Sequence, residues 1–230
     1  MDHPLDRPIW TALVTRHAAL AEGRGGARRY PADVSPFAAT VDDRPQSLAD
    51  LAALARPGLS MIFMQASPVV LPPGLVPVET ADSVQMVAEG PIAAIDDPRI
   101  EPLGEADAQE MLALALLTKP GPFTARARDL GDFWGIRRGG ALIAMAGERL
   151  RAPGHAEVSG VCTHPDARGE GLGRLMLTHV AGRIAARGER PFLHSYTWNE
   201  VAIRLYESVG FVKRSAMHVA VVTMREDAGT

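Results

Sequence analysis

The glycine-rich segment Arg168-Gly169-Glu170-Gly171-Leu172-Gly173 contains the residue types that bind phosphate groups. Glycine has no Cβ, so a ligand can approach the main chain and the turn can take positive φ angles. If a helix begins here, its first N–H groups are unpaired and carry the positive end of the helix dipole. Arg168 adds a cation whose fork fits phosphate oxygens. The segment therefore predicts a pyrophosphate cradle, although a tight strand-to-helix turn has the same composition.

The flanking residues must position this segment, and they predict a strand before it and a helix after it. Residues 158–163 are short, mostly apolar and rich in β-branched side chains, which is typical of a strand. The turn His164-Pro165-Asp166 ends that strand, because proline cannot donate to a sheet. Beyond the glycines, apolar side chains at helical spacing predict one buried face, made by Leu172, Leu175, Met176, His179, Val180 and Ile184.

This order resembles motif A of the GCN5-related N-acetyltransferase (GNAT) superfamily. That motif is an Arg or Gln, two residues, a Gly, one residue, and a Gly or Ala; Arg168, Gly171 and Gly173 match it. A second GNAT signature is a strand, an Asn that leads a short helix, and a closing Tyr-Glu-x-x-Gly-Phe. It is matched by residues 192–196, Asn199 and residues 206–211. The resemblance spans Glu157 to Phe211, and the order of elements suits the FR47-like subgroup.

The resemblance implies a GNAT fold of the α/β (α+β) class, with a mixed, mostly antiparallel sheet whose central strands splay apart between helices. It also implies acetyl-CoA as co-substrate, with its pyrophosphate on the glycine loop and its pantetheine arm along the preceding strand. No metal is expected, because His164 and His179 lack partners at metal-ligand spacing. The implied cofactor contacts are Val161, Cys162, Thr163, Arg168, Gly169, Glu170, Gly171, Leu172, Gly173, Arg174, Asn199 and Tyr206.

The expected reaction is direct attack of a primary amine on the acetyl thioester in a ternary complex. Tyr206 is the predicted general acid for the departing thiolate, because a phenol can protonate such a leaving group; an aromatic packed between helix and sheet is the alternative. Asn199 is predicted to contact the cofactor, to cap the following helix, or both. Cys162 is disfavoured as a nucleophile, since no histidine–carboxylate pair in the sequence is placed to activate it.

The general base is less defined. Glu157 is the predicted base, because many GNAT relatives carry a glutamate at the start of this strand; a solvated charge at a strand end is the alternative. Glu148 on the neighbouring strand and His194 on the strand after the loop helix are further candidates. The sequence leaves these possibilities open.

The N-terminal region, residues 1–95, carries no recognisable chemistry, and residues 96–230 form the predicted GNAT domain. The first region is expected to be either a degenerate copy of the same fold or an unrelated α/β extension. Apolar spacing predicts a helix over residues 5–22 and a strand at residues 61–64, while the prolines of residues 68–77 predict extended or irregular chain.

Composition indicates an ordinary globular protein. The chain has 230 residues, a formal net charge of −3 and one cysteine, so it forms no intrachain disulfide and fits a reducing compartment. Its arginines are dispersed, which argues against sequence-independent nucleic-acid binding. No apolar run is long enough to span a bilayer, and no signal peptide is recognised. We therefore expect a cytoplasmic protein without nucleic-acid or membrane partners; a homodimer stays open.

Other phosphate binders fit the motif less well. A P-loop would need Gly-Lys-Ser/Thr where the chain has Gly173-Arg174-Leu175, and a dinucleotide-binding turn would need Gly-x-Gly-x-x-Gly. A non-catalytic acetyl-CoA sensor and an acyltransferase for a different acyl-CoA remain alternatives. The acceptor amine could belong to an amino acid, a polyamine, an aminoglycoside or a protein N-terminus. The large N-terminal region favours a small molecule, because it could cover an open peptide groove.

Overall fold

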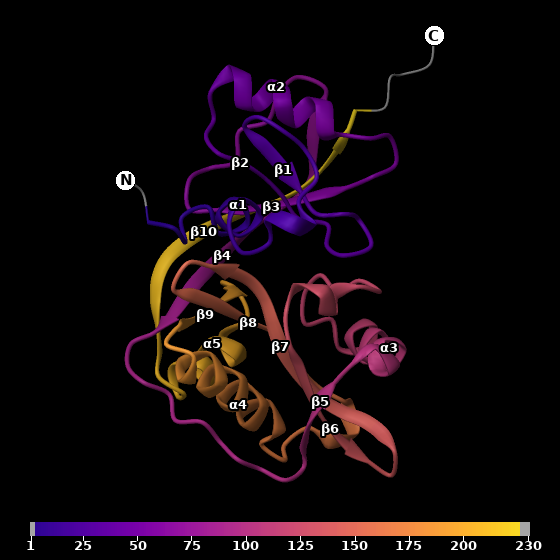
Figure 1. Ribbon diagram of the computed structural model, residues 1–230, viewed down its shortest axis with the longest axis vertical. Coiled ribbons are helices and arrows are strands. Elements are labelled where there is room, and N and C mark those ends of the chain that lie inside the picture. Colours follow the sequence, from indigo (N-terminus) through magenta and orange to yellow (C-terminus); the bar gives the residue numbers. More distant parts are fainter. Residues whose placement is uncertain (1–2, 226–230) are drawn as a thin grey trace.

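The computed structural model describes residues 3–225, which fold around one eight-stranded sheet with a small two-stranded sheet at one end (Figure 1). The strands are β1 Ala27–Arg29, β2 Ala38–Thr40, β3 Met61–Gln65, β4 Leu75–Ala88, β5 Ile100–Leu103, β6 Phe133–Arg138, β7 Ala141–Ala152, β8 His155–Thr163, β9 Arg190–Tyr196 and β10 Phe211–Met224. The α-helices are α1 Pro8–Val14, α2 Pro45–Leu54, α3 Ala108–Thr118, α4 Leu172–Ala186 and α5 Glu200–Glu207.

The large sheet has the order β3-β10-β4-β9-β8-β7-β6-β5 and is antiparallel except between β8 and β9. Those two strands pair in parallel only as far as Glu157 and Phe192, and beyond this point they diverge. The strand, glycine turn and helix predicted around residue 170 are all present, as β8, the loop and α4. The predicted mixed sheet with splayed central strands is therefore confirmed.

The helices α3 and α4 cover opposite faces of the sheet. Met145 and Ala146 are neighbours on β7 and so face opposite sides. Met145 packs with Met111 and Leu114 of α3, whereas Ala146 belongs to the cluster formed with Met176 of α4. The alternation of buried side chains along β7 thus joins both helix layers to one sheet.

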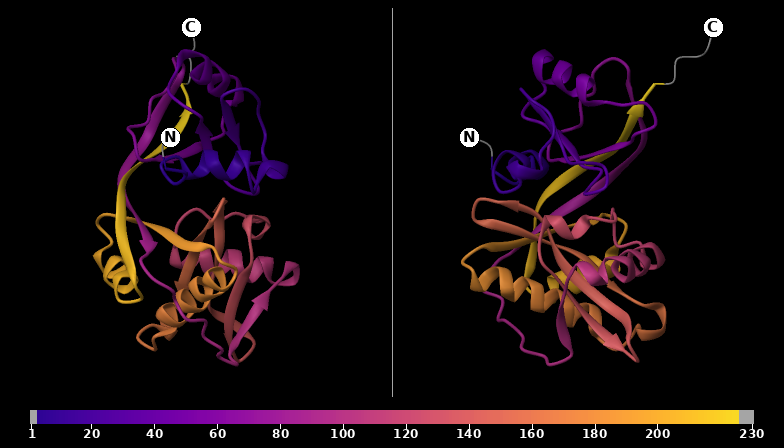
Figure 2. Two further views of the ribbon diagram at one scale, coloured as in Figure 1. Left: turned by 60° about the vertical axis from the view of Figure 1, so that its left-hand side comes forward. Right: turned by 45° about the vertical axis from the view of Figure 1, so that its right-hand side comes forward.

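The N-terminal region contributes strands to the same sheet. β4 lies between β9 and β10, and both β4 and β10 pass from the N-terminal region toward the other half of the molecule in the two views of Figure 2. β3 pairs with the outer edge of β10. The boundary predicted after residue 95 stays a prediction, as does a degenerate copy of the fold, but strands from before residue 95 complete this sheet. No helix of residues 3–225 is long and apolar enough to cross a membrane.

One prediction for the N-terminal region needs correction. The helix expected over residues 5–22 is α1, which ends at Val14 because Thr15 leaves helical geometry, and a 3-10 turn follows at Ala18–Leu20. The chain of residues 68–77, expected to be extended or irregular, enters β4 at Leu75. Pro77 is tolerated within β4, because the pairing with β10 shifts register beside it.

We expect Gly182→Ala to destabilise the protein although alanine is the better helix former. A Cβ on Gly182 of α4 would lie 2.6 Å from Cα of Ala94 and 2.9 Å from the carbonyl oxygen of Ala93. The resulting strain is expected to lower the free energy of unfolding by ~1–3 kcal/mol, more than the ~1 kcal/mol of helix propensity gained. Urea unfolding measures this.

Gly90→Ala is the matched control, because a Cβ on the exposed Gly90 meets no atom within 4 Å. Its unfolding midpoint should match that of the wild type. A Gly182→Ala variant as stable as Gly90→Ala would contradict the close packing of residues 93–94 on α4.

Candidate active site

The divergence of β8 and β9 opens a cavity of about 940 Å³. Its walls come from the edge of β8, the glycine loop, β9 and α5, and its far end is closed by the N-terminal region and the loop after α3. The residues that line it are Phe37, Ile62, Met64, Ser83, Thr118–Pro122, Arg149, Val161–Thr163, Ala167–Gly169, Gly171–Arg174, His194–Tyr196, Trp198, Asn199, Val201, Ala202, Leu205, Tyr206 and Val219.

The glycine loop presents a run of unpaired main-chain donors. Within the described chain, none of the N–H groups of residues 169–174 donates a hydrogen bond; the first bond at this end of α4 is from Leu175 N–H to the Gly171 carbonyl. Gly169 and Gly171 have φ angles of 83° and 77°, and a Cβ on either would meet no atom within 4 Å. Glycine is needed here for the backbone angles, and the open space leaves the amides accessible.

The charged residues of the loop play different parts. Arg168 lines the cavity, and so does Arg174, whose guanidinium also bonds the Ser208 side chain at the C-terminal end of α5 (2.6 Å). Glu170 lies outside the cavity lining and pairs with Arg138 of β6, which lowers the pKa of its carboxyl. The Glu170 side chain therefore does not contribute to the cavity wall, and its contact with the cofactor stays a prediction.

Along β8, a bulge turns the backbone at the cavity wall. The register with β7 shifts beside Met145, and Gly160 takes a φ of 63°. Beyond Glu157, β8 has no pairing with β9, so the backbone groups on that edge are free to bind an extended ligand arm. Cys162 lines this wall, and burial raises the pKa of its thiol to about 11. A thiol so protonated is a poor nucleophile.

The two residues of the second signature both line the cavity. Asn199 caps α5 by accepting a hydrogen bond from the Ala202 N–H (3.2 Å), as predicted. Tyr206 packs edge-to-face on Phe211, and burial raises the pKa of its phenol. Its hydroxyl forms no hydrogen bond with any residue from 3 to 225, although the side chain borders the cavity. Tyr206 is therefore a protonated donor without a protein partner.

Glu157 lies at the vertex where β8 and β9 diverge, fully buried and outside the cavity lining. A second bulge sets Arg149 and Leu150 of β7 opposite it. Its carboxylate accepts Arg149 Nε (2.8 Å) and Nη2 (2.6 Å), the Leu150 N–H (3.2 Å) and His194 Nδ1 (2.7 Å). Burial alone would raise the pKa of Glu157, but the charge and hydrogen bonds of Arg149 and His194 outweigh it and lower the pKa to about 2. The role of Glu157 as general base stays a prediction, and a carboxylate so occupied has little affinity for a proton.

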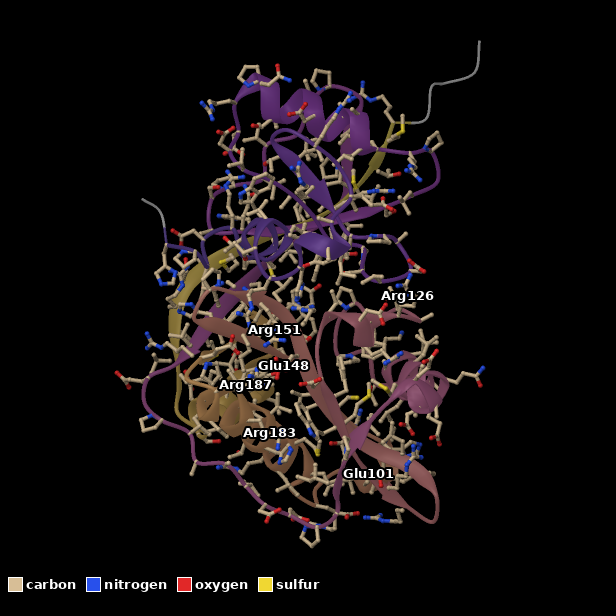
Figure 3. The ribbon with its side chains drawn as sticks, in the orientation of Figure 1. Glu101, Arg126, Glu148, Arg151, Arg183 and Arg187 are labelled. Atoms are coloured by element: carbon tan, nitrogen blue, oxygen red, sulfur yellow. The ribbon has the colours of Figure 1, made fainter. Side chains whose placement is uncertain are left out.

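The other two base candidates are also engaged. His194 lines the cavity, but its Nε2 accepts a hydrogen bond from Gln85 (2.9 Å), and burial lowers its pKa. Glu148 is fully buried and pairs with Arg187 at the end of α4 (2.8 Å) and with Arg151 (3.7 Å). Figure 3 shows the side chains of Glu148, Arg151 and Arg187 close together above α4. Glu148 is not part of the cavity lining.

Sequence reasoning missed Arg149 and the apolar end of the cavity. Arg149 is one of many dispersed arginines, and only the bulge in β7 singles it out. Phe37, Ile62 and Met64 reach the cavity through the packing of the N-terminal region on β10. No motif in the sequence marks these contacts.

The network around Glu157 predicts a pH-dependent stability. Because its folded pKa lies below the ordinary value of 4.5, its contribution is complete above about pH 4.5 and is lost as the pH falls toward 2. We expect Glu157→Gln to lower the free energy of unfolding by about 3–5 kcal/mol at pH 7. The difference in free energy of unfolding between the variant and the wild type should become smaller as the pH falls from 5 to 2. Urea unfolding at several pH values measures it.

Glu200→Gln serves as the control, because Glu200 and its partner Arg204 are exposed on α5. Its effect should stay within ~0.5 kcal/mol. A Glu157→Gln variant as stable as this control at pH 7 would show that the buried pair does not hold the vertex.

Three comparisons place the chain among known proteins. The family model of the FR47-like proteins matches residues 133–220. The N-alpha-acetyltransferase RimI of Mycobacterium tuberculosis is 35% identical over 124 residues, covering 48% of this chain and 77% of that protein.

Solved structures extend the likeness to the N-terminal region. A crystal structure assigned to the GNAT acetyltransferases, from Novosphingobium aromaticivorans, superposes with a TM-score of 0.92 at 45% identity and covers 98% of this chain and 100% of that chain. A GCN5-related N-acetyltransferase from Kribbella flavida, 18% identical with a TM-score of 0.61, shares the fold over 98% of this chain and 96% of its own. The chain therefore belongs to the GNAT superfamily of N-acetyltransferases, in its FR47-like subgroup.

Proposed function

We propose that the protein transfers acetyl from acetyl-CoA to a primary amine by direct attack within a ternary complex, and that the pyrophosphate of the donor binds the loop of residues 168–174. The observation that carries this is the run of N–H groups at residues 169–174 that have no hydrogen-bond partner among residues 3–225, in a loop that is open at Gly169 and Gly171 beside Arg168. Unpaired N–H groups at a helix start form an anion site. The free edge of β8 leads from this loop toward the vertex and suits the pantetheine arm.

In the proposed reaction, the amine nitrogen attacks the thioester carbonyl carbon and forms the new C–N bond. Main-chain N–H groups on the free edge of β8, around Val161 to Thr163, stabilise the negative charge that develops on the carbonyl oxygen. The C–S bond then breaks, the electron pair leaves with sulfur, and the thiolate takes a proton. The reactants are aligned by the cavity, which lowers the entropic barrier.

Tyr206 is the proposed proton donor to the thiolate. Its hydroxyl is free of protein hydrogen bonds within residues 3–225, and the raised pKa of the phenol keeps the proton in place until a strong base forms beside it. The proposed contact of Asn199 with the donor is compatible with its cap on α5, because an amide oxygen that caps the helix leaves its N–H₂ group available.

The amine must also lose a proton. The contacts of Glu157 support a positioning role, in which it holds Arg149 and His194 at the vertex, and water then carries the amine proton away. The large N-terminal region, which could cover an open peptide groove, supports a small amine acceptor. The single cysteine supports a cytoplasmic location, and the dispersed arginines argue against a nucleic-acid partner. No membrane partner is proposed. A homodimer stays a prediction.

Thiol release from acetyl-CoA with a panel of amines tests this mechanism. We expect Tyr206→Phe to lower kcat about 100-fold, because general acid catalysis contributes roughly 10²–10⁴-fold. The affinity for acetyl-CoA should stay near that of the wild type, since the phenyl ring and its contact with Phe211 remain.

Tyr30→Phe is the control, because the buried Tyr30 hydroxyl bonds His17 (2.8 Å) and lies outside the cavity lining. It should lower the melting temperature while leaving kcat unchanged. An unchanged kcat in Tyr206→Phe would remove Tyr206 from the mechanism, and acetyl-CoA binding without turnover on any amine would indicate a sensor.

A further inference from the structure

The end of the cavity away from the glycine loop has a composition of its own. It is bounded by Arg149 at the strand vertex and by an apolar wall from the N-terminal region and β10, formed by Phe37, Ile62, Met64 and Val219. Resting on the proposed function, we infer that the acceptor is a small apolar amino acid. Its carboxylate would bind Arg149, its side chain would contact the apolar wall, and its amine would face the thioester.

Arg149 is held in place by two of its three guanidinium nitrogens. The bulge in β7 sets it opposite Glu157, which takes Nε and Nη2. The guanidinium also lies over the ring of Phe37, with 4.8 Å from Cζ to the ring centroid. A fork fixed on both sides loses little freedom when a ligand binds. The orientation of Arg149 is therefore preset before the acceptor arrives.

The remaining nitrogen, Nη1, has no hydrogen-bond partner among residues 3–225. It lies near Gly121 in the loop after α3, and both residues line the cavity. The Arg149 side chain is 13% exposed, and an anionic acceptor group at Nη1 would form a charge-assisted hydrogen bond. The geometry leaves one guanidinium nitrogen for a ligand carboxylate.

The charge of the lining supports the same class of acceptor. Among the described residues, the cavity is lined by the cations Lys119, Arg149, Arg168 and Arg174 and by no Asp or Glu. Arg168 and Arg174 flank the proposed diphosphate, which leaves Arg149 and Lys119 for the acceptor. A polyamine or aminoglycoside would bring several positive charges to a site with no carboxylate to pair them. An amino acid brings the opposite charge beside its amine.

The apolar wall favours some amino-acid side chains over others. Phe37 and Met64 are buried, and Val219 of β10 belongs to the same apolar cluster. A charged or amide side chain placed against this wall would lose its hydration without a partner, which is unfavourable. Leucine, methionine or phenylalanine side chains would gain from burial there. The acceptor class is therefore apolar amino acids, with free carboxylates.

The experiment compares leucine with leucinamide and isoamylamine, which keep the side chain and amine but lack the carboxylate, and with spermidine. Thiol release with acetyl-CoA should give kcat/KM about tenfold or more higher for leucine than for the other three, because a charge-assisted hydrogen bond is lost in each. This comparison uses the wild-type protein and needs no variant to fold.

Arg149→Lys tests the residue itself. Lysine keeps a positive charge beside Glu157 but has a single nitrogen, so none is left for the acceptor carboxylate. The fall in kcat/KM should therefore be about tenfold larger for leucine than for leucinamide, mainly through KM. Arg151→Lys is the matched control on the same strand, because Arg151 pairs with Glu148 and Glu189 outside the cavity lining. It should keep the wild-type preference for leucine.

An equal kcat/KM for leucine and leucinamide with the wild type would overturn the inference. An equal fall in kcat/KM for the two amines in Arg149→Lys would overturn it as well. A preference for spermidine would also overturn it while leaving the proposed function intact. Failure of every amine to release thiol would overturn the proposed function and this inference together.

Discussion

The structure depends on one constraint: a protein rarely leaves a run of backbone N–H groups without partners, unless a ligand or water is to take them. Here the N–H groups of residues 169–174 are left open by a glycine turn at the start of α4. The parallel pairing of β8 and β9 stops at Glu157 and opens a second set of backbone groups along β8. The cavity lies between the glycine loop and the free edge of β8, and it exists because β8 and β9 do not pair beyond Glu157.

Keeping two strands apart requires support at their vertex. Glu157, Arg149 and His194 supply it by linking β8, β7 and β9 through a carboxylate that accepts four hydrogen bonds. On the other side of β9, Gln85 of β4 bonds His194 and accepts a hydrogen bond from Arg214 of β10. The N-terminal region is thereby coupled to the site, since β4 fills the place between β9 and β10. This explains why a region without catalytic motifs shapes the end of the cavity away from the glycine loop.

The sequence predicted the parts of the site that local chemistry determines. The glycine loop, the flanking strand and helix and the capping Asn199 follow from φ requirements, periodicity and short-range hydrogen bonds. It could not predict β4, whose pairing with β9 and β10 joins residues far apart in the chain. Arg149 was missed for a related reason: its role arises from a bulge, and a bulge depends on the register of two strands.

Calorimetric titration with acetyl-CoA tests the central claim that the open amides of the loop bind the diphosphate. The wild type should bind with measurable heat, and Gly171→Val should weaken binding about tenfold or more, because a β-branched residue at a φ of 77° distorts the turn that presents the amides. Gly139→Val imposes comparable strain at a φ of 58° in the β6–β7 turn, outside the cavity lining, and should bind as the wild type does. Equal affinity in all three proteins, or no binding by the wild type, would contradict the account.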